Sequence, residues 1–247
     1  GRDMGSIIGV DITQAAGLLP FDVRTPRIDF AVSTSLKWMC GTPGAGMIYV
    51  DADLIPEFQP ELRGWFSQNN PFSWALDRFD YAPDIRRFDS GTPASMAAIA
   101  SVPALKWHAG QDRDAIVSHN RALVDQIIAH ADALDLPLQS PREAARRGGT
   151  MMLQMPSKAE AGAVVGALGV EGISVDHRDA LMRLSPGVLT QADHVDLAFD
   201  LVRQTMTTRR ARFAGRLPSA ARPEPGASAA EVLAQVAGDL ASGRITV

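Results

Sequence analysis

The sequence lacks several features that would indicate particular classes of protein. It has one cysteine, Cys40, which excludes an intramolecular disulfide and a metal cluster built from several cysteines. No stretch approaches the roughly 18 uninterrupted apolar residues of a membrane-spanning helix, so we expect no membrane partner. The first residues show no basic stretch followed by a long apolar run, and we therefore predict no secretion signal and a cytoplasmic location.

Lysine is also scarce. The chain has 24 basic residues, of which three are lysines (Lys37, Lys106 and Lys158) and the others arginines. The net charge is -4 without a dense basic patch, so nucleic acid is not an expected partner. Arginine stays protonated, whereas a buried lysine amine can lose its proton and act as a nucleophile. Two of the lysines belong to helical patterns and are predicted to be solvated, and Lys37 alone lies between an apolar strand and a glycine-rich loop.

The first part of the chain predicts a sheet. With 247 residues and 46% apolar content, the chain is long enough for one large or two modest domains. Strands are predicted at residues 6–12, 29–35 and 47–50, and their continuous apolar runs favour a parallel sheet covered on both faces. Residues 52–90 have little periodicity and many aromatic residues and prolines, which is typical of a functional loop region. We take residues 1–95 as one domain.

The pattern then changes to alternating helices and short strands. The predicted helices lie at residues 95–109, 113–134, 159–168 and 192–212. The predicted short strands lie at residues 136–138, 151–155, 173–175 and 182–184. This alternation predicts a helical connection and a small α+β domain over residues 96–214. Residues 215–247 are rich in Pro, Ala, Gly and Arg and end in a helical pattern, which predicts a flexible linker and a short terminal helix.

Two charged residues are predicted to meet at one edge of the sheet. Asp11 ends the first predicted strand, and Lys37 lies 26 positions later, the length of one strand–crossover–strand unit. Both would then lie at the carboxyl edge, where open α/β sheets bind ligands. A buried aspartate needs a cationic partner such as a protonated pyridine nitrogen, although a helix cap or a surface acid is the simpler alternative. Gln14 has an amide to donate to a phenolic oxygen, and Ser35 with Thr34 offers hydroxyls to a phosphate.

A family resemblance is carried by six short segments in a fixed order. They are residues 10–17 (VDITQAAG), 29–37 (DFAVSTSLK), 41–44 (GTPG), 63–66 (RGWF), 86–93 (RRFDSGTP) and 182–186 (MRLSP). Together they resemble the class V aminotransferase family of pyridoxal phosphate (PLP) enzymes of fold type I, with the kynureninase-like branch nearest. The resemblance runs from about residue 5 to 210. It implies an α/β fold: part of a three-layer PLP-transferase large domain with a mostly parallel sheet, followed by a small α+β C-terminal domain.

The resemblance assigns cofactor roles to residues of the first domain. Lys37 would hold PLP as a Schiff base, the internal aldimine, and would later move protons. Asp11 would pair with the pyridine nitrogen, and Gln14 would lie near the phenolic oxygen. Ser35 remains a candidate for the phosphate.

The resemblance also implies a second subunit and an amino-acid substrate. Trp65 and Thr92 match positions that reach the phosphate of the neighbouring subunit in kynureninase-like homodimers. Simple packing for Trp65 and a turn role for Thr92 are the alternatives. Arg183 matches the arginine that holds the α-carboxylate of the substrate, and its planar fork suits a carboxylate. A structural ion pair is the alternative for Arg183.

Some positions depart from the family pattern. Leu36 stands where the kynureninase branch has a tyrosine, and Gln14 where animal kynureninases have histidine, which makes kynurenine itself a doubtful substrate. Only ten residues precede Asp11, where family members have about half of their large domain, including an aromatic residue that stacks on the pyridine ring. We therefore expect the chain to correspond to the second half of the large domain plus the small domain, and to bind PLP weakly or not at all by itself.

The sequence leaves the reaction open. A kynureninase-like hydrolase or a class V aminotransferase is the first hypothesis. A PLP-dependent C–S lyase or desulfurase is an alternative, although Cys40 lies three residues after Lys37 and desulfurases place their sulfur-accepting cysteine on a later mobile loop. A non-catalytic PLP-fold sensor or assembly module is a further alternative, which the retained Asp11, Lys37 and Arg183 disfavour.

Overall fold

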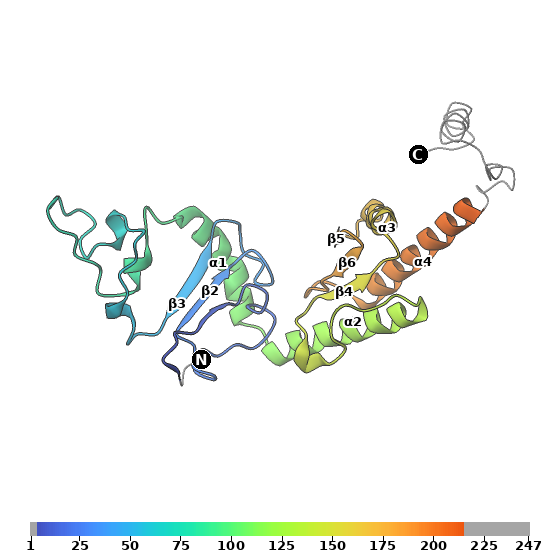
Figure 1. Ribbon diagram of the computed structural model, residues 1–247, viewed down its shortest axis with the longest axis horizontal. Helices are drawn as coiled ribbons and strands as arrows, with labels where there is room; N and C mark the ends of the chain where they lie inside the picture. The colour runs from blue at the N-terminus through green and yellow to red at the C-terminus, as the bar shows by residue number, and fades with distance from the viewer. Residues whose placement is uncertain (1–3, 215–247) are drawn as a thin grey trace, which may run out of the picture. The chain divides into compact units, whose positions relative to one another are not determined.

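The computed structural model describes residues 4–214, which form two compact units (Figure 1). The first unit contains the described residues up to 129 together with residues 138–152 and 184–191. The second contains residues 130–137 and 153–183 and the described residues from 192 onward. The chain therefore passes between the units several times, and neither unit is a single stretch of sequence. The predicted linker and terminal helix lie outside the described residues.

The first unit is built on a three-stranded sheet in the order β1-β2-β3. The strands are β1 (Gly9–Asp11), β2 (Phe30–Thr34) and β3 (Gly46–Val50). Strands β1 and β2 are parallel, as predicted, whereas β2 and β3 are antiparallel. The difference follows from the connections, because a parallel pair needs a crossover of about a dozen residues or more, whereas a shorter loop returns the chain antiparallel. Residues 35–45 form such a loop.

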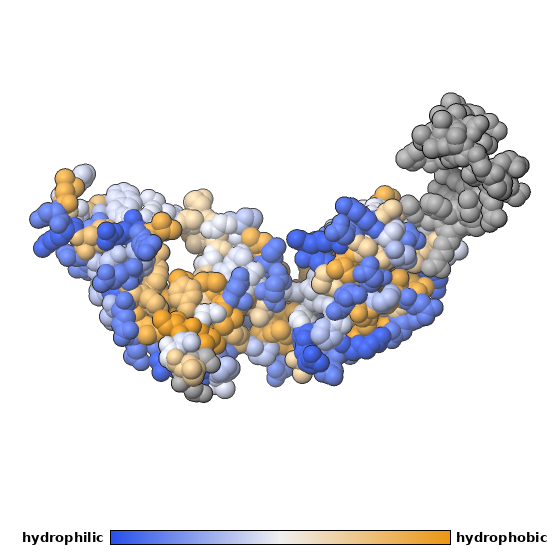
Figure 2. All heavy atoms as spheres, in the orientation of Figure 1, coloured by the Kyte–Doolittle hydropathy of each residue, from blue (hydrophilic) through white to orange (hydrophobic). Residues whose placement is uncertain are grey.

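The sheet is only partly covered. Met47 and Ile48 point to opposite faces of β3, and they are 43% and 38% exposed. Figure 2 shows hydrophobic residues gathered at the surface over this sheet. The described residues thus supply only part of the three-layer arrangement expected of the large domain.

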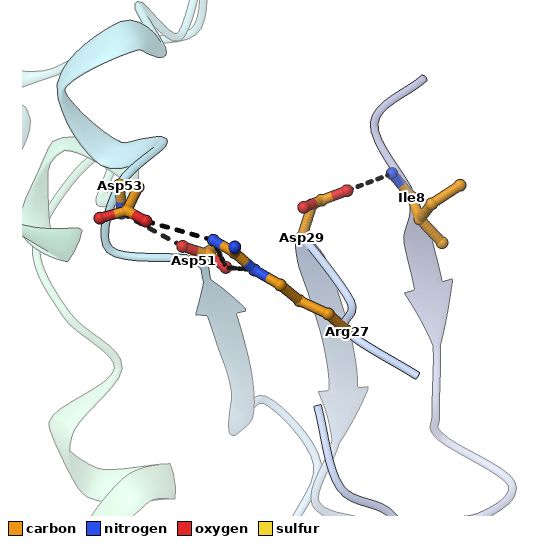
Figure 3. A network of polar contacts seen from close by, with 5 residues as sticks. All are labelled: Ile8, Arg27, Asp29, Asp51 and Asp53. Atoms are coloured by element: carbon orange, nitrogen blue, oxygen red, sulfur yellow. Dashed lines mark hydrogen bonds and ion pairs between the residues drawn. The ribbon is translucent and has the colours of Figure 1, made fainter. Parts of the chain in front are cut away.

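Acidic residues fix the edge of the sheet where β2 begins and β3 ends (Figure 3). Arg27 Nε donates to Asp51 Oδ2 over 2.7 Å, and Arg27 Nη2 reaches Asp53 Oδ2 over 3.2 Å. The buried Asp29 accepts a hydrogen bond from the backbone of Ile8 at 2.9 Å. These contacts join the segments that lead into β1 and β2 to the end of β3.

The irregular region between β3 and the first long helix is held by one buried arginine. It contains three short 3₁₀ helices, η2 (Ile55–Glu57), η3 (Trp65–Ser67) and η4 (Ile85–Phe88). The guanidinium of Arg87 donates to the carbonyl oxygens of Ala82 and Phe58, each at 2.9 Å, and to that of Ile55. A charge-assisted donor satisfies several buried carbonyl groups here, which explains how a segment with so little regular structure is ordered.

Two long helices follow, as the sequence predicts. They are α1 (Ser95–Ala109) and α2 (Arg113–Ala133). Helix α2 begins after Asp112, whose carboxylate accepts from the backbone of Asp114 at 2.9 Å, an N-cap contact. The apolar side chains of Leu123, Val124 and Ile127 on this helix are buried. No helix in the described part of the chain is long and apolar enough to cross a membrane.

The remaining elements are the short 3₁₀ helix η5 (Ala144–Arg146), a second small sheet and two helices. Strands β4 (Met151–Gln154), β5 (Asp176–Arg178) and β6 (Leu181–Leu184) pair in the order β4-β6-β5. Helix α3 (Lys158–Val170) packs against α4 (Ala192–Ala214) and against β5. The core side chains include Met151, Leu153, Met155, Val164, Leu168, Met182 and Val202.

Two strand predictions in this part were wrong. The strand predicted at residues 173–175 lies at 176–178. Residues 136–138 form no named strand, although Leu138 forms a bridge and residues 137–139 exchange backbone hydrogen bonds with Met152 and Gln154 of β4. Strand β5 forms where it can pair with β6, and its central residue His177 lies opposite Met182. Cross-strand pairing therefore outweighs the apolar pattern just before it.

Candidate cofactor site

Asp11, Gln14 and Lys37 lie at the same edge of the first sheet. Asp11 is the last residue of β1 and pairs in register with Val32 of β2, while Lys37 follows the end of β2 by three residues. Because the two strands are parallel, their carboxyl ends meet at this edge. The side chains of all three residues are exposed. The structure thus places Asp11 and Lys37 at one accessible edge of the sheet, as predicted from the two strand ends.

Asp11 is exposed rather than buried, and its charge is stabilised locally. Its carboxylate Oδ1 accepts from the backbone N–H of Thr13 at 2.8 Å. Hydrogen bonds from the side chain and the backbone of Thr13 lower the pKa of Asp11 below its ordinary value. The side chain is therefore an anion at neutral pH, the form required to pair with a pyridinium nitrogen.

Gln14 is held by Trp38, a residue that sequence reasoning did not single out. The indole Nε1 of Trp38 donates to Gln14 Oε1 over 3.1 Å. Indole nitrogen is a donor only, so the amide oxygen faces the ring and the amide NH₂ group faces away. The one sequence signal for Trp38 is its position directly after Lys37.

Ser35 lies inside the lysine-bearing loop, residues 35–45. It is 2% exposed, and its hydroxyl is within hydrogen-bonding distance of the carbonyl oxygens of Thr42 (3.1 Å) and Ala45 (3.0 Å) and of Ser101 Oγ (3.3 Å). A Cβ on Gly41 would lie 2.6 Å from the Ser35 side chain, so the loop is closely packed here. The structure therefore does not bring the Ser35 hydroxyl to the exposed edge with Asp11 and Lys37.

Helix α1 anchors this loop. Ser101 accepts from the backbone N–H of Thr42 at 3.0 Å, and Thr42 Oγ1 donates to the carbonyl of Ala97 at 2.8 Å. Further along α1, His108 is hydrogen-bonded to the backbone of Trp38. Burial lowers the pKa of His108, and the contact with Trp38 opposes this effect. Together with the contact between Ser35 and Ser101, these hydrogen bonds fix the loop to one helix on both sides of Lys37.

Trp65 and Thr92 belong to two segments that lie against each other. A Cβ on Gly64 would lie 1.6 Å from the carbonyl oxygen of Ser90, so the backbones touch there. The Trp65 ring is 48% exposed and Thr92 is exposed. In residues 4–214, neither side chain has a hydrogen bond or a ring contact with Asp11, Gln14 or Lys37.

Arg183 lies on β6, in the second unit, and pairs with an acid on the neighbouring strand. Its Nε donates to Asp176 Oδ1 at 2.5 Å, and its Nη2 contacts Asp176 Oδ2. This contact raises the pKa of Arg183 and lowers that of Asp176. The structural ion pair considered as the alternative for Arg183 is therefore present, while the N–H groups of Nη1 remain available to another anion.

The fold and the edge residues define a class of protein. The structure has an acid at the end of one strand and a lysine after its parallel neighbour. This is the arrangement that the resemblance to the PLP-dependent class V aminotransferases implies. The chain belongs to the class V aminotransferase family, since the family's sequence model, Aminotransferase class-V, matches residues 1–179. The family is PLP-dependent. Arg183 lies beyond the end of that match.

Individual relatives agree with this assignment. The chain is 30% identical over 200 residues to "Uncharacterized aminotransferase YcbU" of Bacillus subtilis, covering 79% of this chain and 50% of that protein. It is 27% identical over 183 residues to a kynureninase of Pseudomonas fluorescens, covering 72% of this chain and 43% of that protein. The chain spans about half the length of the curated relatives it matches, or less.

A solved structure shows the same fold. The apo structure of a cysteine desulfurase from Thermococcus onnurineus NA1 matches with a TM-score of 0.76 and 21% identity, covering 84% of this chain and 54% of that one. At this level of identity the match establishes the fold alone. It confirms the prediction of an α/β fold of the PLP-dependent transferase type.

Proposed function

We propose that this chain supplies the lysine-bearing part of a PLP-dependent enzyme that acts on an amino acid, with Lys37 as the Schiff-base lysine. The observation that carries the proposal is the placement of Asp11 and Lys37 at the carboxyl ends of two adjacent parallel strands. PLP supplies an electron-withdrawing ring to such a site. The protein supplies charge, orientation and proton transfer around it.

The residues present fit this cofactor. Asp11 is an anion and would keep the pyridine nitrogen protonated. The NH₂ group of Gln14 is turned outward as a donor because Trp38 binds the amide oxygen. Lys37 is exposed, and in the described part of the chain no acid forms an ion pair with it. Its Nζ is therefore accessible to a carbonyl carbon and can afterwards move a proton at the substrate's α-carbon.

The reaction is proposed to be that of a kynureninase-like hydrolase or a class V aminotransferase. Both a kynureninase and a protein described as an aminotransferase are among its relatives. A C–S lyase or desulfurase is the second candidate, favoured by the relatives described as probable cysteine desulfurases. Cys40 is exposed but lies in the lysine loop itself, so this chain provides no separate mobile cysteine loop that we can assign to sulfur transfer.

The proposal includes partners. Trp65 and Thr92, exposed beside one backbone contact, would reach the cofactor phosphate of a second subunit in a cytoplasmic homodimer. Arg183 would hold the α-carboxylate of the substrate through its Nη1 side, next to Asp176. Because the relatives are about twice as long, we propose that the rest of the cofactor site comes from a segment outside these 247 residues. The chain alone would then bind PLP weakly or not at all.

Borohydride reduction tests the role of Lys37. The intact protein, with the proposed segment outside these 247 residues, is mixed with PLP and reduced, and its peptides are analysed by mass spectrometry. A pyridoxyl group is expected on the Lys37 peptide, lost in Lys37→Arg and retained in Lys106→Arg, which changes an exposed lysine of α1. Modification of another lysine, or none in the wild type, would contradict the proposal. Product analysis with candidate amino acids then separates hydrolysis, transamination and C–S cleavage.

A further inference from the structure

We propose that Trp38 is a positioning residue that fixes the carboxamide of Gln14, so that its NH₂ group, and not its oxygen, faces the phenolic oxygen of PLP. This inference rests on the proposed function. It concerns a side chain that does not itself contact the reacting atoms but determines how a cofactor contact is made.

The hydrogen bond between Trp38 and Gln14 allows one orientation of the Gln14 amide. Trp38 Nε1 donates to Gln14 Oε1 at 3.1 Å. With the amide turned over, two donors would face each other, because indole nitrogen cannot accept. Gln14 is exposed, and an exposed glutamine without such a partner would rotate freely. The Gln14 amide can act as a donor or as an acceptor, and the indole of Trp38 therefore leaves it as a donor toward the site.

Trp38 can do this because its own ring is fixed. A Cβ on Gly149 would lie 2.9 Å from Trp38 Cη2 and 3.1 Å from Cζ2, and 2.1 Å from Cδ2 of the buried Leu18. Gly149 thus packs directly against the indole. On the other side of the backbone, a Cβ on Gly17 would lie 2.7 Å from the carbonyl carbon of Trp38. No side chain fits at either glycine, so both remain in close contact with Trp38.

A buried amide holds the Gly149 segment in place. Asn120 of α2 is 2% exposed, and its Nδ2 donates to the carbonyls of Gly149 (3.1 Å) and Pro186 (2.9 Å). Removing such a buried contact leaves carbonyl groups without a donor, which is costly. A continuous set of contacts therefore runs from Asn120 through Gly149 and Trp38 to Gln14.

The orientation has a measurable chemical consequence. With PLP bound, a donor at its phenolic oxygen would draw negative charge away from that atom and would lower the pKa of the nitrogen that Lys37 contributes. When the donor is lost, this pKa rises. One hydrogen bond of ordinary net strength corresponds to a shift of about half to one pH unit.

The test is a pH titration of the visible absorbance of the intact PLP-loaded protein. Trp38→Phe keeps an aromatic ring but removes the N–H, and the titration midpoint is expected to rise by about half to one unit. Trp107→Phe, the same change at an exposed tryptophan of α1, is the control and leaves the midpoint unchanged. Gln14→Ala is expected to produce the same rise, and the double variant with Trp38→Phe no further rise.

Other titrating groups near the site stay the same in this comparison. They are Asp11 on β1, Lys37 and Cys40 on the loop, and His108 on α1. The contact between His108 and Trp38 is made to the Trp38 backbone. If Trp38→Phe does not fold, benzothienylalanine at position 38 keeps the shape of the indole and replaces its N–H with sulfur. The same rise is expected with this residue.

The outcomes separate the two proposals. If the intact wild-type protein, with the proposed segment outside these 247 residues, shows no PLP band, the proposed function and this inference are both overturned. If the wild-type protein shows the PLP band, and its titration midpoint equals that of the variant without the indole N–H at position 38, the inference alone is overturned. The borohydride result at Lys37 would still stand in that case.

Discussion

The contact between Ser101 and the lysine-bearing loop leads to a quantitative prediction for Ser101→Ala. Ser101 is 1% exposed, accepts from the backbone N–H of Thr42 and donates to the carbonyl of Ala97. Alanine leaves the Thr42 N–H without its acceptor inside the protein. An unsatisfied buried donor costs about 1–3 kcal/mol, and the Thr42 N–H is partly buried. We therefore expect the free energy of unfolding to fall toward the lower end of this range in urea denaturation.

A control variant measures how much a serine-to-alanine change in a helix alters stability by itself. Ser118→Ala makes the same substitution at an exposed position of α2 and is expected to alter stability by less than about 0.5 kcal/mol. Hydrogen exchange gives a second readout, because the amides of Ser35 and Gly41, bonded to the carbonyls of Ala45 and Ser35, should exchange faster in Ser101→Ala only. Equal stability of the two variants, with unchanged exchange in the loop, would refute the view that α1 holds the lysine loop.

Three further predictions follow from the packing and the charges. Gly64→Ala should destabilise the region of residues 64–92 because its Cβ would lie 1.6 Å from the Ser90 carbonyl oxygen. A Cβ on Gly91 meets nothing within 4 Å, so Gly91→Ala is the control. Limited proteolysis should cleave the Gly64 variant faster than the wild type and the Gly91 variant at the wild-type rate. Leu153→Ala should lower the free energy of unfolding by about 2–5 kcal/mol in urea denaturation because Leu153 is fully buried. Leu189→Ala, at an 84% exposed position, should have a small effect. Equal effects of the two variants would contradict the placement of the core. Arg27 lowers the pKa of Asp51 below its ordinary 3.8, so the ionised carboxylate stabilises the fold above about pH 4 and this contribution is lost as the pH falls through the lowered pKa. Asp51→Asn should therefore flatten the acid limb of the stability–pH curve, and the exposed Asp77→Asn should not.

The sequence predicted helices better than strands, for a physical reason. Helix α1 was predicted at its observed bounds, and α2 to within one residue. The signals of α2 are local, since it has an N-cap contact at Asp112 and buried apolar positions, whereas α1 has no side-chain N-cap contact. Strand β5 contains Asp176, His177 and Arg178, a composition that does not indicate a strand. It forms through its pairing with β6, and such pairing is not visible in a local pattern. The antiparallel return of β3 likewise depends on the length of the loop before it.

The site likewise has features that local sequence signals predict and features that depend on distant residues. The edge position of Asp11 and Lys37 could be predicted from strand ends alone. The burial of Ser35 could not, because it depends on Ser101, a residue 66 positions away on α1. Trp38 was missed because its role requires Gln14, Leu18 and Gly149 to be brought around it by the fold.

Arg183 shows why residue chemistry alone does not separate a ligand site from a structural pair. A planar guanidinium fork suits the carboxylate of a substrate and the carboxylate of Asp176 equally well. The hairpin register places Asp176 directly opposite Arg183, so the pair forms without any ligand. Both functions fit on one side chain because the pair uses the Nε and Nη2 groups and leaves Nη1 to a second anion. Asp176 then orients the guanidinium and partly offsets its charge, so a substrate carboxylate would be held more by geometry than by net attraction.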